Sequence, residues 1–376
     1  MFLKNIQISQ FRNIGQAELE FCPGFNVLYG NNGQGKSNLL EAIYILAYLK
    51  GFRGAHISEL VMQDRPGAQL SAVLDREGAQ TKLGIELTGK QRKVWLDHNP
   101  CGRLADYLGV MRVILFVPSD VGLLQAAPLE RRTCLDRMVF NHQPVYLDSL
   151  DRYTKTLRLK SSELRSEQPN HEMLDVYDQT LAYYGSEIIR ARYQFFERIT
   201  PYLQASFSSI FDDRFLCQPQ YMCASGGTHV FGHQGESMDL EELLDAFAKK
   251  LATSRHTELA RQQCSSGPHR DDWTLVLNGR TSRYFASQGQ QRSMILALKM
   301  AEIACIKSLM GIEPVFLLDD ISSELDPTRN ARLANALYGM TTQTFLTTTS
   351  KQHFQLPSDG RMFHVEAGMF TPDNPS

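Results

Sequence analysis

The chain has 376 residues, of which 43% are hydrophobic and 21% charged, and its formal net charge is −2. These values are typical of a globular protein long enough to form two lobes. The longest apolar runs fall short of the roughly 18 residues that a membrane-spanning helix needs. The seven cysteines include no C-x-x-C pair, so we expect reduced thiols in a cytoplasmic protein, and neither a zinc site nor a disulfide framework.

Strand patterns dominate the first part of the chain. Apolar and polar residues alternate there in several short runs, and one apolar stretch has helical spacing instead. The expected strands are residues 3–11, 17–21, 25–29, 69–74, 82–87, 93–96 and 112–117, and the expected helix is 38–49. Several of the strands are expected to form an antiparallel sheet.

Helical spacing takes over near residue 119. Apolar residues recur at three- and four-residue intervals to about residue 210, with a polar break at 166–170 that predicts a hairpin of two long helices. Residues 212–236 are rich in Gly, Ser and Asp and are expected to be irregular. The later elements are expected as helices at 239–261, 288–310 and 328–338 and as strands at 273–277, 314–318 and 343–348.

These patterns predict an α/β fold in which a discontinuous nucleotide-binding lobe carries a mainly helical insertion. The two halves of the lobe are expected at residues 1–118 and 265–376, and the insertion at 119–264. Trp95 and Trp273 lie in strand patterns and are expected in the core. The tail from residue 366 to 376 carries no motif and is expected to fray.

A phosphate-binding loop follows the strand expected at 25–29. Eight consecutive residues fit G-x-x-x-x-G-K-[ST] and precede the helix pattern, which is the context that this motif requires. They are Gly30, Asn31, Asn32, Gly33, Gln34, Gly35, Lys36 and Ser37, with Asn38 next. The glycines let backbone N–H groups face phosphate oxygens, Lys36 reaches the β- and γ-phosphates, and Ser37 binds Mg²⁺. The sequence therefore predicts a site for ATP with Mg²⁺.

Two adjacent carboxylates end an apolar strand pattern far along the chain. Asp319 and Asp320 follow residues 315–318. In a nucleotide site, Asp319 would support Mg²⁺ and Asp320 would orient or deprotonate the attacking water. Paired aspartates also suit a helix N-cap, but the presence of Lys36 in the same chain favours the catalytic interpretation.

A third segment, residues 285–292, predicts the start of another helix, for which Ser287 is a natural N-cap. With the loop and the acidic strand, it resembles the signature segment of the ABC ATPases. In that family, the signature serine of one subunit contacts the γ-phosphate held by another. Carried over by position, Ser287, Gly289 and Gln290 align with L-S-G-G-Q, Gln288 replaces its first Gly, and Asp326 aligns with the D-loop aspartate.

Several segments match residue patterns that are more specific than those shared by all ABC ATPases. They resemble the RecF family, bacterial recombination mediators related to the SMC ATPase heads. The segments are residues 11–13, 30–38, 267–272, 287–292 and 317–326, with 115–120 and 130–136 similar to the family's entry into its helical lobe. The resemblance implies an ATP-dependent homodimer that clamps duplex DNA near single-strand gap junctions. It further implies that the clamp works with RecR and RecO to load RecA on DNA coated by single-strand-binding protein, and that weak, DNA-stimulated ATP hydrolysis releases it.

Departures from the ABC pattern bear on catalysis. ABC ATPases usually carry a histidine where this chain has Thr347-Thr348-Thr349, and usually a Glu where it has Asp320. Because Asp is one methylene shorter, we expect slow hydrolysis, which suits a clamp better than a motor. Arg12 is expected either to contact a nucleotide phosphate or to form a surface ion pair, and His269 to shape the approach to the signature helix.

Basic residues gather between positions 131 and 165, where eight stand against four acidic residues. The candidates for weak DNA binding are Arg131, Arg132, Arg152, Lys155 and Arg158. The last three recur every three residues and would share a helix face. A solvated face with ordinary ion pairs explains the same pattern.

Two other classes of ABC ATPase remain as alternatives, a transporter-type subunit and another SMC-like protein. The 250 positions from Ser37 to Ser287 are too many for a transporter subunit. Long SMC arms need sustained heptads, which the chain lacks.

Overall fold

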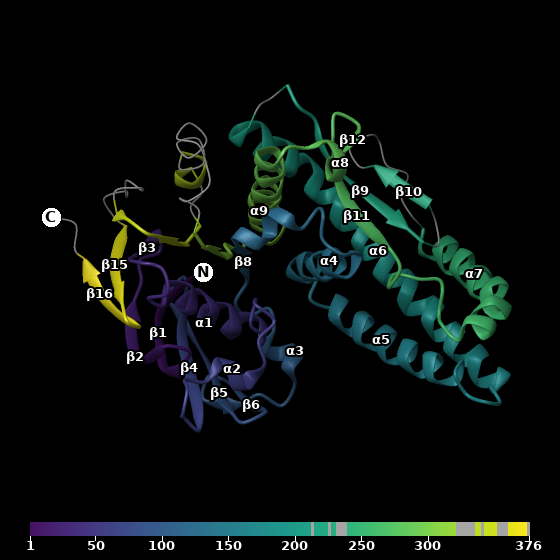
Figure 1. Ribbon diagram of the computed structural model, residues 1–376, viewed down its shortest axis with the longest axis horizontal. Coiled ribbons are helices and arrows are strands. Elements are labelled where there is room, and N and C mark those ends of the chain that lie inside the picture. Colours follow the sequence, from purple (N-terminus) through teal and green to yellow (C-terminus); the bar gives the residue numbers. More distant parts are fainter. Residues whose placement is uncertain are drawn as a thin grey trace. The chain divides into compact units, whose positions relative to one another are not determined.

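The computed structural model describes residues 1–211, 214–224, 227–230, 239–320, 335–339, 342–351 and 360–373. The chain divides into two compact units (Figure 1). The first unit comprises Met1–Val121, Ser209–Phe211 and Glu302–Ser376, and the second comprises Gly122–Ser208 and Asp212–Ala301. The boundary expected between residues 264 and 265 therefore falls inside the second unit.

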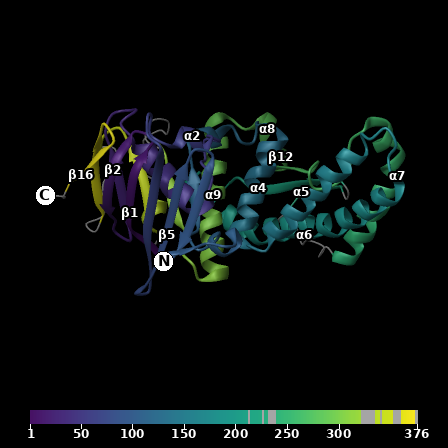
Figure 2. The same ribbon diagram turned by 90° about the horizontal axis from the view of Figure 1, so that it is seen from below.

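One six-stranded antiparallel sheet of the first unit has the order β2-β1-β4-β5-β6-β7. Its strands β2, β1 and β5 are labelled in Figure 2. Its strands are β1 (Phe2–Phe11), β2 (Ile14–Glu20), β4 (Gly67–Arg76), β5 (Ala79–Thr88), β6 (Gln91–Leu96) and β7 (Asn99–Pro100). Buried and more exposed residues alternate along β4, as expected for a sheet with one solvated face. The predicted strands in this region are confirmed, with small shifts at their ends.

The other six-stranded sheet has the order β16-β15-β3-β14-β13-β8, and only the pairing of β15 with β16 is antiparallel. It contains β3 (Phe25–Tyr29), β8 (Val113–Phe116), β13 (Val315–Leu318), β14 (Thr344–Thr348), β15 (Arg361–Glu366) and β16 (Met369–Asp373). Every residue of β8, β13 and β14 is buried, which explains their continuous apolar runs. Parallel pairing of β3 with β14 brings the P-loop and the end of β14 to the same edge of the sheet.

The tail expected to fray instead forms a hairpin of this sheet. β15 pairs with β3, and β16 pairs with β15 from Met362↔Asp373 to Glu366↔Met369. Backbone pairing therefore orders the chain as far as residue 373, and residues 374–376 lie outside the described part.

Side chains of both sheets share one core with α1 (Lys36–Tyr48). All residues from Leu39 to Ala47 are buried, so the helix is covered on every side. The same unit holds the short helices α2 (Ile57–Leu60) and α3 (Leu104–Tyr107) and the 3₁₀ turn η1 (Pro118–Gly122). Packing around α1 fixes the P-loop, because the loop joins β3 to the start of this helix.

The second unit combines long helices with a four-stranded sheet of order β10-β9-β11-β12. The helices are α4 (Pro128–His142), α5 (Tyr146–Glu163), α6 (His171–Ile210), α7 (Leu240–Arg261), α8 (Ser282–Phe285) and α9 (Gln288–Met310), the last of which enters the first unit at residue 302. The strands are β9 (Cys217–Cys223), β10 (Gly227–Val230), β11 (Asp272–Leu277) and β12 (Arg280–Thr281). The predicted helical hairpin and the helices at 239–261 and 288–310 are confirmed.

The expectation of an irregular stretch at 212–236 was wrong, because this stretch contains β9 and β10. β9 pairs with β11 from Asp272↔Met222 to Leu277↔Cys217, a partner far along the chain. Trp273 on β11 is fully buried, as predicted. Within the described residues, no helix has both the length and the apolar character to cross a membrane.

Candidate nucleotide-binding site

The P-loop has the strained backbone that its glycines permit. Gly30, Gly33 and Gly35 have φ values of 147°, 79° and 117°. A side chain at Gly30 would overlap the carbonyl oxygen of Val365 on β15, and one at Gly35 would come within 2.9 Å of Asn13 Oδ1. The glycines thus meet a steric as well as a conformational requirement.

Lys36 opens α1 and is 7% exposed. Its Nζ donates hydrogen bonds to the carbonyl oxygens of Gly30 (2.6 Å) and Asn31 (2.8 Å). Burial lowers the pKa of Lys36, and the negative charges of Asp320 and Asp319 oppose this effect without cancelling it. The ammonium is therefore held at the loop by neutral oxygens, which the anionic oxygens of a phosphate can replace with a gain in electrostatic energy.

The carboxyl end of β13 faces the start of α1. Asp319 is 7% exposed, and its Oδ1 accepts hydrogen bonds from Ser37 Oγ at 2.7 Å and Thr347 Oγ1 at 2.8 Å. A hydroxyl and a carboxylate side by side are oxygen ligands of the kind that Mg²⁺ prefers. The predicted pair of Ser37 and Asp319 is thus brought together from distant parts of the sequence.

Asp320 has an unusual backbone and an unpaired carboxylate oxygen. Its φ is 46°, and its N–H donates to Thr347 Oγ1 at 2.8 Å. Its Oδ1 is buried and has no hydrogen-bond partner in the part of the chain that the structure describes. Strain combined with an unsatisfied buried acceptor is expected where a ligand or water completes the site.

These groups surround a cavity of about 380 Å³. Its lining residues are Asn32, Gly33, Gly35, Lys36, Ser37, Asn38, Arg53, Pro118, Asp319, Asp320 and Thr347. Loop backbone, a buried ammonium and two carboxylates fit a polyphosphate with a divalent cation. Gly30 and Asn31 contact Lys36 through their carbonyl oxygens, whereas the Gln34 side chain bonds to the β15–β16 hairpin.

Of the two roles predicted for Arg12, phosphate contact or ion pair, the structure shows an ion pair. Its Nε lies 2.9 Å from Glu41 Oε2, and its Nη1 donates to the carbonyl oxygen of Glu59. The Glu41 side chain is fully buried, so this pair lies within the fold and not at an open surface. Arg12 is absent from the cavity lining formed by the described residues.

Sequence reasoning did not select three residues that shape the site. Arg53 lies in the loop after α1, with Nη2 4.0 Å from Asp319 Oδ2 and Nη1 3.3 Å from Asn38 Oδ1. Asn13 accepts from Asn38 Nδ2 at 2.8 Å. Thr347 was noted only for the missing histidine, yet it holds both aspartates. A short motif does not reveal such partners because they meet only in the folded sheet.

Ser287 stands at the start of α9 in the second unit and is exposed. Its Oγ accepts from the Gln290 N–H at 3.3 Å, while Gln290 Oε1 accepts from the Ser287 N–H at 2.8 Å. This arrangement is a capping box, the alternative that the sequence left open. An exposed, capped helix start is also compatible with an anion. Asp326, assigned to the D-loop, lies outside the described residues.

The basic candidates for DNA binding differ in exposure, since Arg131 is buried, Arg132 is half-buried and the other three are exposed. Arg131 is 1% exposed and pairs with Asp272, and Arg132 donates to the carbonyl oxygen of Asp271 at 2.8 Å. The prediction that Arg131 contacts DNA was therefore wrong, because its guanidinium is buried and paired with Asp272 inside the second unit. The exposed residues, all on α5, are Arg152, Lys155 and Arg158.

Local partners engage two of these three exposed residues. Lys155 pairs with Asp151 at 2.7 Å, and Arg152 donates to the Tyr184 hydroxyl at 3.1 Å. Arg158 has no ion-pair partner among the residues that the structure describes. It is thus the α5 cation most available for another molecule.

His269 is enclosed within the second unit. Its Nδ1 lies 2.7 Å from the Tyr153 hydroxyl. Burial lowers its pKa from 6.5 to about 4, so the ring is neutral at pH 7. These contacts show a packing role and leave the predicted influence on the signature helix untested.

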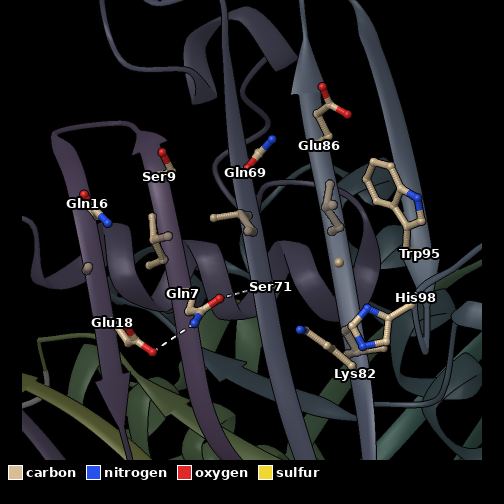
Figure 3. Close-up of a pocket in the computed structure, with 16 residues that line it drawn as sticks. Gln7, Ser9, Gln16, Glu18, Gln69, Ser71, Lys82, Glu86, Trp95 and His98 are labelled. Carbon is tan, nitrogen blue, oxygen red and sulfur yellow. Dashed lines mark hydrogen bonds between the residues drawn. The ribbon is translucent and has the colours of Figure 1, made fainter.

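A second hollow, of about 660 Å³, lies on the solvated face of the antiparallel sheet (Figure 3). Gln7 in its floor donates to Glu18 and accepts from Ser71. Trp95, expected in the core, instead lines this hollow beside Gly84. The dashed lines in Figure 3 join Gln7 to Glu18 and to Ser71. The residues that line this hollow include no phosphate-binding loop, so the nucleotide site is assigned to the smaller cavity.

Comparisons with known proteins show which family this chain resembles. The family model described as RecF/RecN/SMC N terminal domain matches residues 2–369. The DNA replication and repair protein RecF of Streptococcus uberis is 36% identical over 379 residues, with 99% of this chain and 100% of the relative covered. The protein of the same name from Geobacter sulfurreducens is 37% identical over 374 residues, again with 99% and 100% covered.

Solved structures described as RecF are also similar to this chain. One, described as the recombination mediator protein RecF-ATPrS in the RecFOR pathway, has a TM-score of 0.89 and 30% identity, covering 99% of this chain and 98% of that one. A second, described as RecF-ATP in the same pathway, has a TM-score of 0.87 and 29% identity, with 99% of each chain covered. An SMC head bound to a domain of ScpA has a TM-score of 0.57 and 14% identity over 99% of this chain and 97% of that one, which indicates a shared fold only.

Proposed function

The chain belongs to the RecF family within the RecF/RecN/SMC group, and from this premise we propose that it is an ATP-dependent DNA-binding protein of replication and recombinational repair. The observation that carries the proposal is the meeting of Lys36, Ser37 and Asp319 at one cavity. Relatives named for DNA replication and repair, and a similar chain described with ATP, support it.

Each residue at the cavity has a distinct proposed task. The loop N–H groups and Lys36 would hold the phosphates, and Ser37 and Asp319 would hold Mg²⁺. When bound, Mg²⁺ would neutralise phosphate charge. Asp320 orients the attacking water or takes its proton, and its short side chain is expected to make hydrolysis slow. Arg53 adds a second cation at the rim.

A second copy of the chain is proposed to complete the site. By resemblance, Ser287 with Gln288, Gly289 and Gln290 would contact the γ-phosphate held by the partner copy. The exposure of Ser287 supports such a contact. Asp326 is proposed as the D-loop residue. ATP would thus join two copies, and hydrolysis, stimulated by DNA, would release them.

The proposed cellular task follows from the relatives. The ATP-bound dimer would clamp duplex DNA near single-strand gaps and work with RecR and RecO in the cytoplasm to load RecA on DNA coated by single-strand-binding protein. Phosphate contacts would come from exposed cations such as Arg158, and their attraction to DNA should fall steeply with salt.

Molecular mass in solution tests this proposal. The wild-type chain is measured by light scattering without nucleotide, with ADP and with ATP and Mg²⁺, each with and without duplex DNA. We expect the dimer mass only with ATP, and Asp320→Asn should make it persist. A monomer in ATP that nonetheless hydrolyses it would contradict the completion of the site by a second copy.

The DNA contact is tested separately by the salt dependence of binding. Arg158→Ala should weaken DNA binding by the ATP form and reduce the salt slope by about one. The matched control is Lys249→Ala, which removes an exposed cation from α7. Equal behaviour of the two variants would exclude Arg158 as a phosphate contact.

A further inference from the structure

We propose that the turn of the β15–β16 hairpin, Ala367-Gly368, is a positioning element that orients the P-loop for phosphate binding. The inference depends on the proposed assignment of the cavity to a nucleotide. It concerns residues that no phosphate-binding motif contains, the first of which lies 333 positions after Gln34.

The turn is bonded to the residue in the middle of the P-loop. The Ala367 N–H donates to Gln34 Oε1 at 2.7 Å, and the Gly368 N–H donates to the Gln34 carbonyl oxygen at 2.8 Å. Asn13 Nδ2 donates to the same carbonyl at 3.1 Å. The hairpin turn and Asn13 therefore hold both ends of one residue, its backbone carbonyl and its side-chain amide.

Holding this carbonyl fixes the direction of the next N–H group. All described peptide bonds are trans, and the C=O and N–H of a trans peptide point in opposite directions. The Gln34 carbonyl points toward the hairpin turn, so the Gly35 N–H points away from it. Gly35 lines the nucleotide cavity, whereas Gln34 is absent from its lining among the described residues. The turn thus sets an N–H group toward the phosphates.

Close packing leaves the turn little freedom. Ala367 and Gly368 have φ values of 48° and 78°, as in a tight two-residue hairpin. A Cβ on Gly368 would overlap the carbonyl oxygen of Asn13. At the far end of β16, the Tyr29 hydroxyl donates to Asp373 Oδ2 at 2.6 Å, and this hydrogen bond raises the pKa of Tyr29 to about 12. The hairpin is therefore bonded to the P-loop at its turn and to β3, the strand before the loop, at its far end.

Gly368→Ala tests the turn, and Gly78→Ala is its matched control. Glu77-Gly78 forms the turn between β4 and β5 with φ values of 55° and 89°, but a Cβ on Gly78 meets no atom within 4 Å. Both substitutions place an alanine at a positive φ and so impose a comparable backbone strain. Only Gly368→Ala displaces a turn bonded to the P-loop.

The measurement is the affinity of the full-length chain for ATP and for ADP, each with Mg²⁺, by titration calorimetry. Loss of the bonds to Gln34 should weaken both ligands about ten-fold in Gly368→Ala, since the loop N–H groups contact phosphates that both carry. Gly78→Ala should bind both like the wild type. If Gly368→Ala bound ATP with wild-type affinity but had a lower melting temperature, the turn would only stabilise the sheet edge. That result would overturn the inference.

A double-mutant cycle separates positioning from general stability. Asn13→Ala removes the other donor to the Gln34 carbonyl, so its effect on ATP affinity should be non-additive with that of Gly368→Ala and additive with that of Gly78→Ala. Asn13→Ala alone should lower the affinity for ATP. This measurement keeps the inference testable if Gly368→Ala does not fold. Additivity in both cycles would contradict the inference. Failure of the wild type to bind ATP would instead contradict the proposed function.

Discussion

The P-loop of the first unit and the α5–α6–α7 junction of the second each bury a lysine, and they hold its charge in opposite ways. Lys36 contacts neutral carbonyl oxygens, and burial lowers its pKa. Lys160 on α5 lies 2.6 Å from Glu258 and 2.5 Å from Asp178. Burial alone would lower the pKa of Lys160, but hydrogen bonds to these carboxylates raise it. A buried cation with neutral partners can bind an anionic ligand, whereas one paired with two carboxylates stabilises the folded chain.

Arg192 in the second unit and Asp320 in the first show a similar contrast. In the second unit, Arg192 donates to Pro268 O at 2.8 Å and pairs with Asp136 at 2.8 Å and Asp271 at 3.5 Å. In the first unit, a carboxylate oxygen of Asp320 is left without a described partner. Arg192 is therefore paired with carboxylates of its own unit, whereas Asp320 has a buried acceptor that no described residue uses.

The largest expected effect comes from the lysine of the second unit. Lys160→Met leaves Glu258 and Asp178 buried without their cation and should lower the free energy of unfolding by about 3–5 kcal/mol. Chemical denaturation of the full chain measures this. A variant as stable as the wild type would show that the junction does not depend on its ion pairs.

The same substitution in the first unit should act on binding and not on folding. Lys36→Met should weaken ATP binding by at least about 100-fold, or about 2.8 kcal/mol, because the phosphates lose their buried cation. Its free energy of unfolding should stay close to that of the wild type, because Lys36 gives up only carbonyl partners. Unchanged ATP affinity in calorimetry would remove the P-loop assignment.

A smaller effect is expected from the buried histidine of the second unit. The pKa of His269 falls to about 4 in the folded chain, so folding favours the neutral ring. This contribution to stability is present above pH 6.5 and is lost as the pH falls from 6.5 toward 4. His269→Gln should therefore lose less stability between pH 7.5 and pH 5 than the wild type, as followed by denaturation at each pH. Equal losses would show that His269 does not titrate in this range.

The sequence predicted those features that depend on short segments. The P-loop and the acidic end of β13 were identified because residues 30–37 and 315–320 contain all the groups that define them. The helices of the second unit were identified because their apolar spacing is regular. Parallel pairing of β3 with β14 and of β14 with β13 joins these segments, an arrangement that the short motifs did not specify.

Features that depend on distant partners were missed. β9 carries Pro219, which weakens a strand pattern, yet its pairing with β11 overrides that signal. Arg131 belongs to a basic stretch, but Asp272, 141 positions later, removes it from the surface. Gly368 lies in a tail without a motif, and only folding places its N–H on Gln34. In each case, the deciding contact is between residues that no local pattern connects.

The central claim is that one ATP site draws on two copies of the chain, and mixing two inactive variants tests it most directly. Lys36→Ala disables the P-loop, and Ser287→Arg disables the signature. A mixed dimer still joins the intact P-loop of the second variant to the intact signature of the first. We predict that each variant alone fails to hydrolyse ATP and that the mixture recovers part of the wild-type turnover. A mixture as inactive as its components would contradict a site shared between two copies.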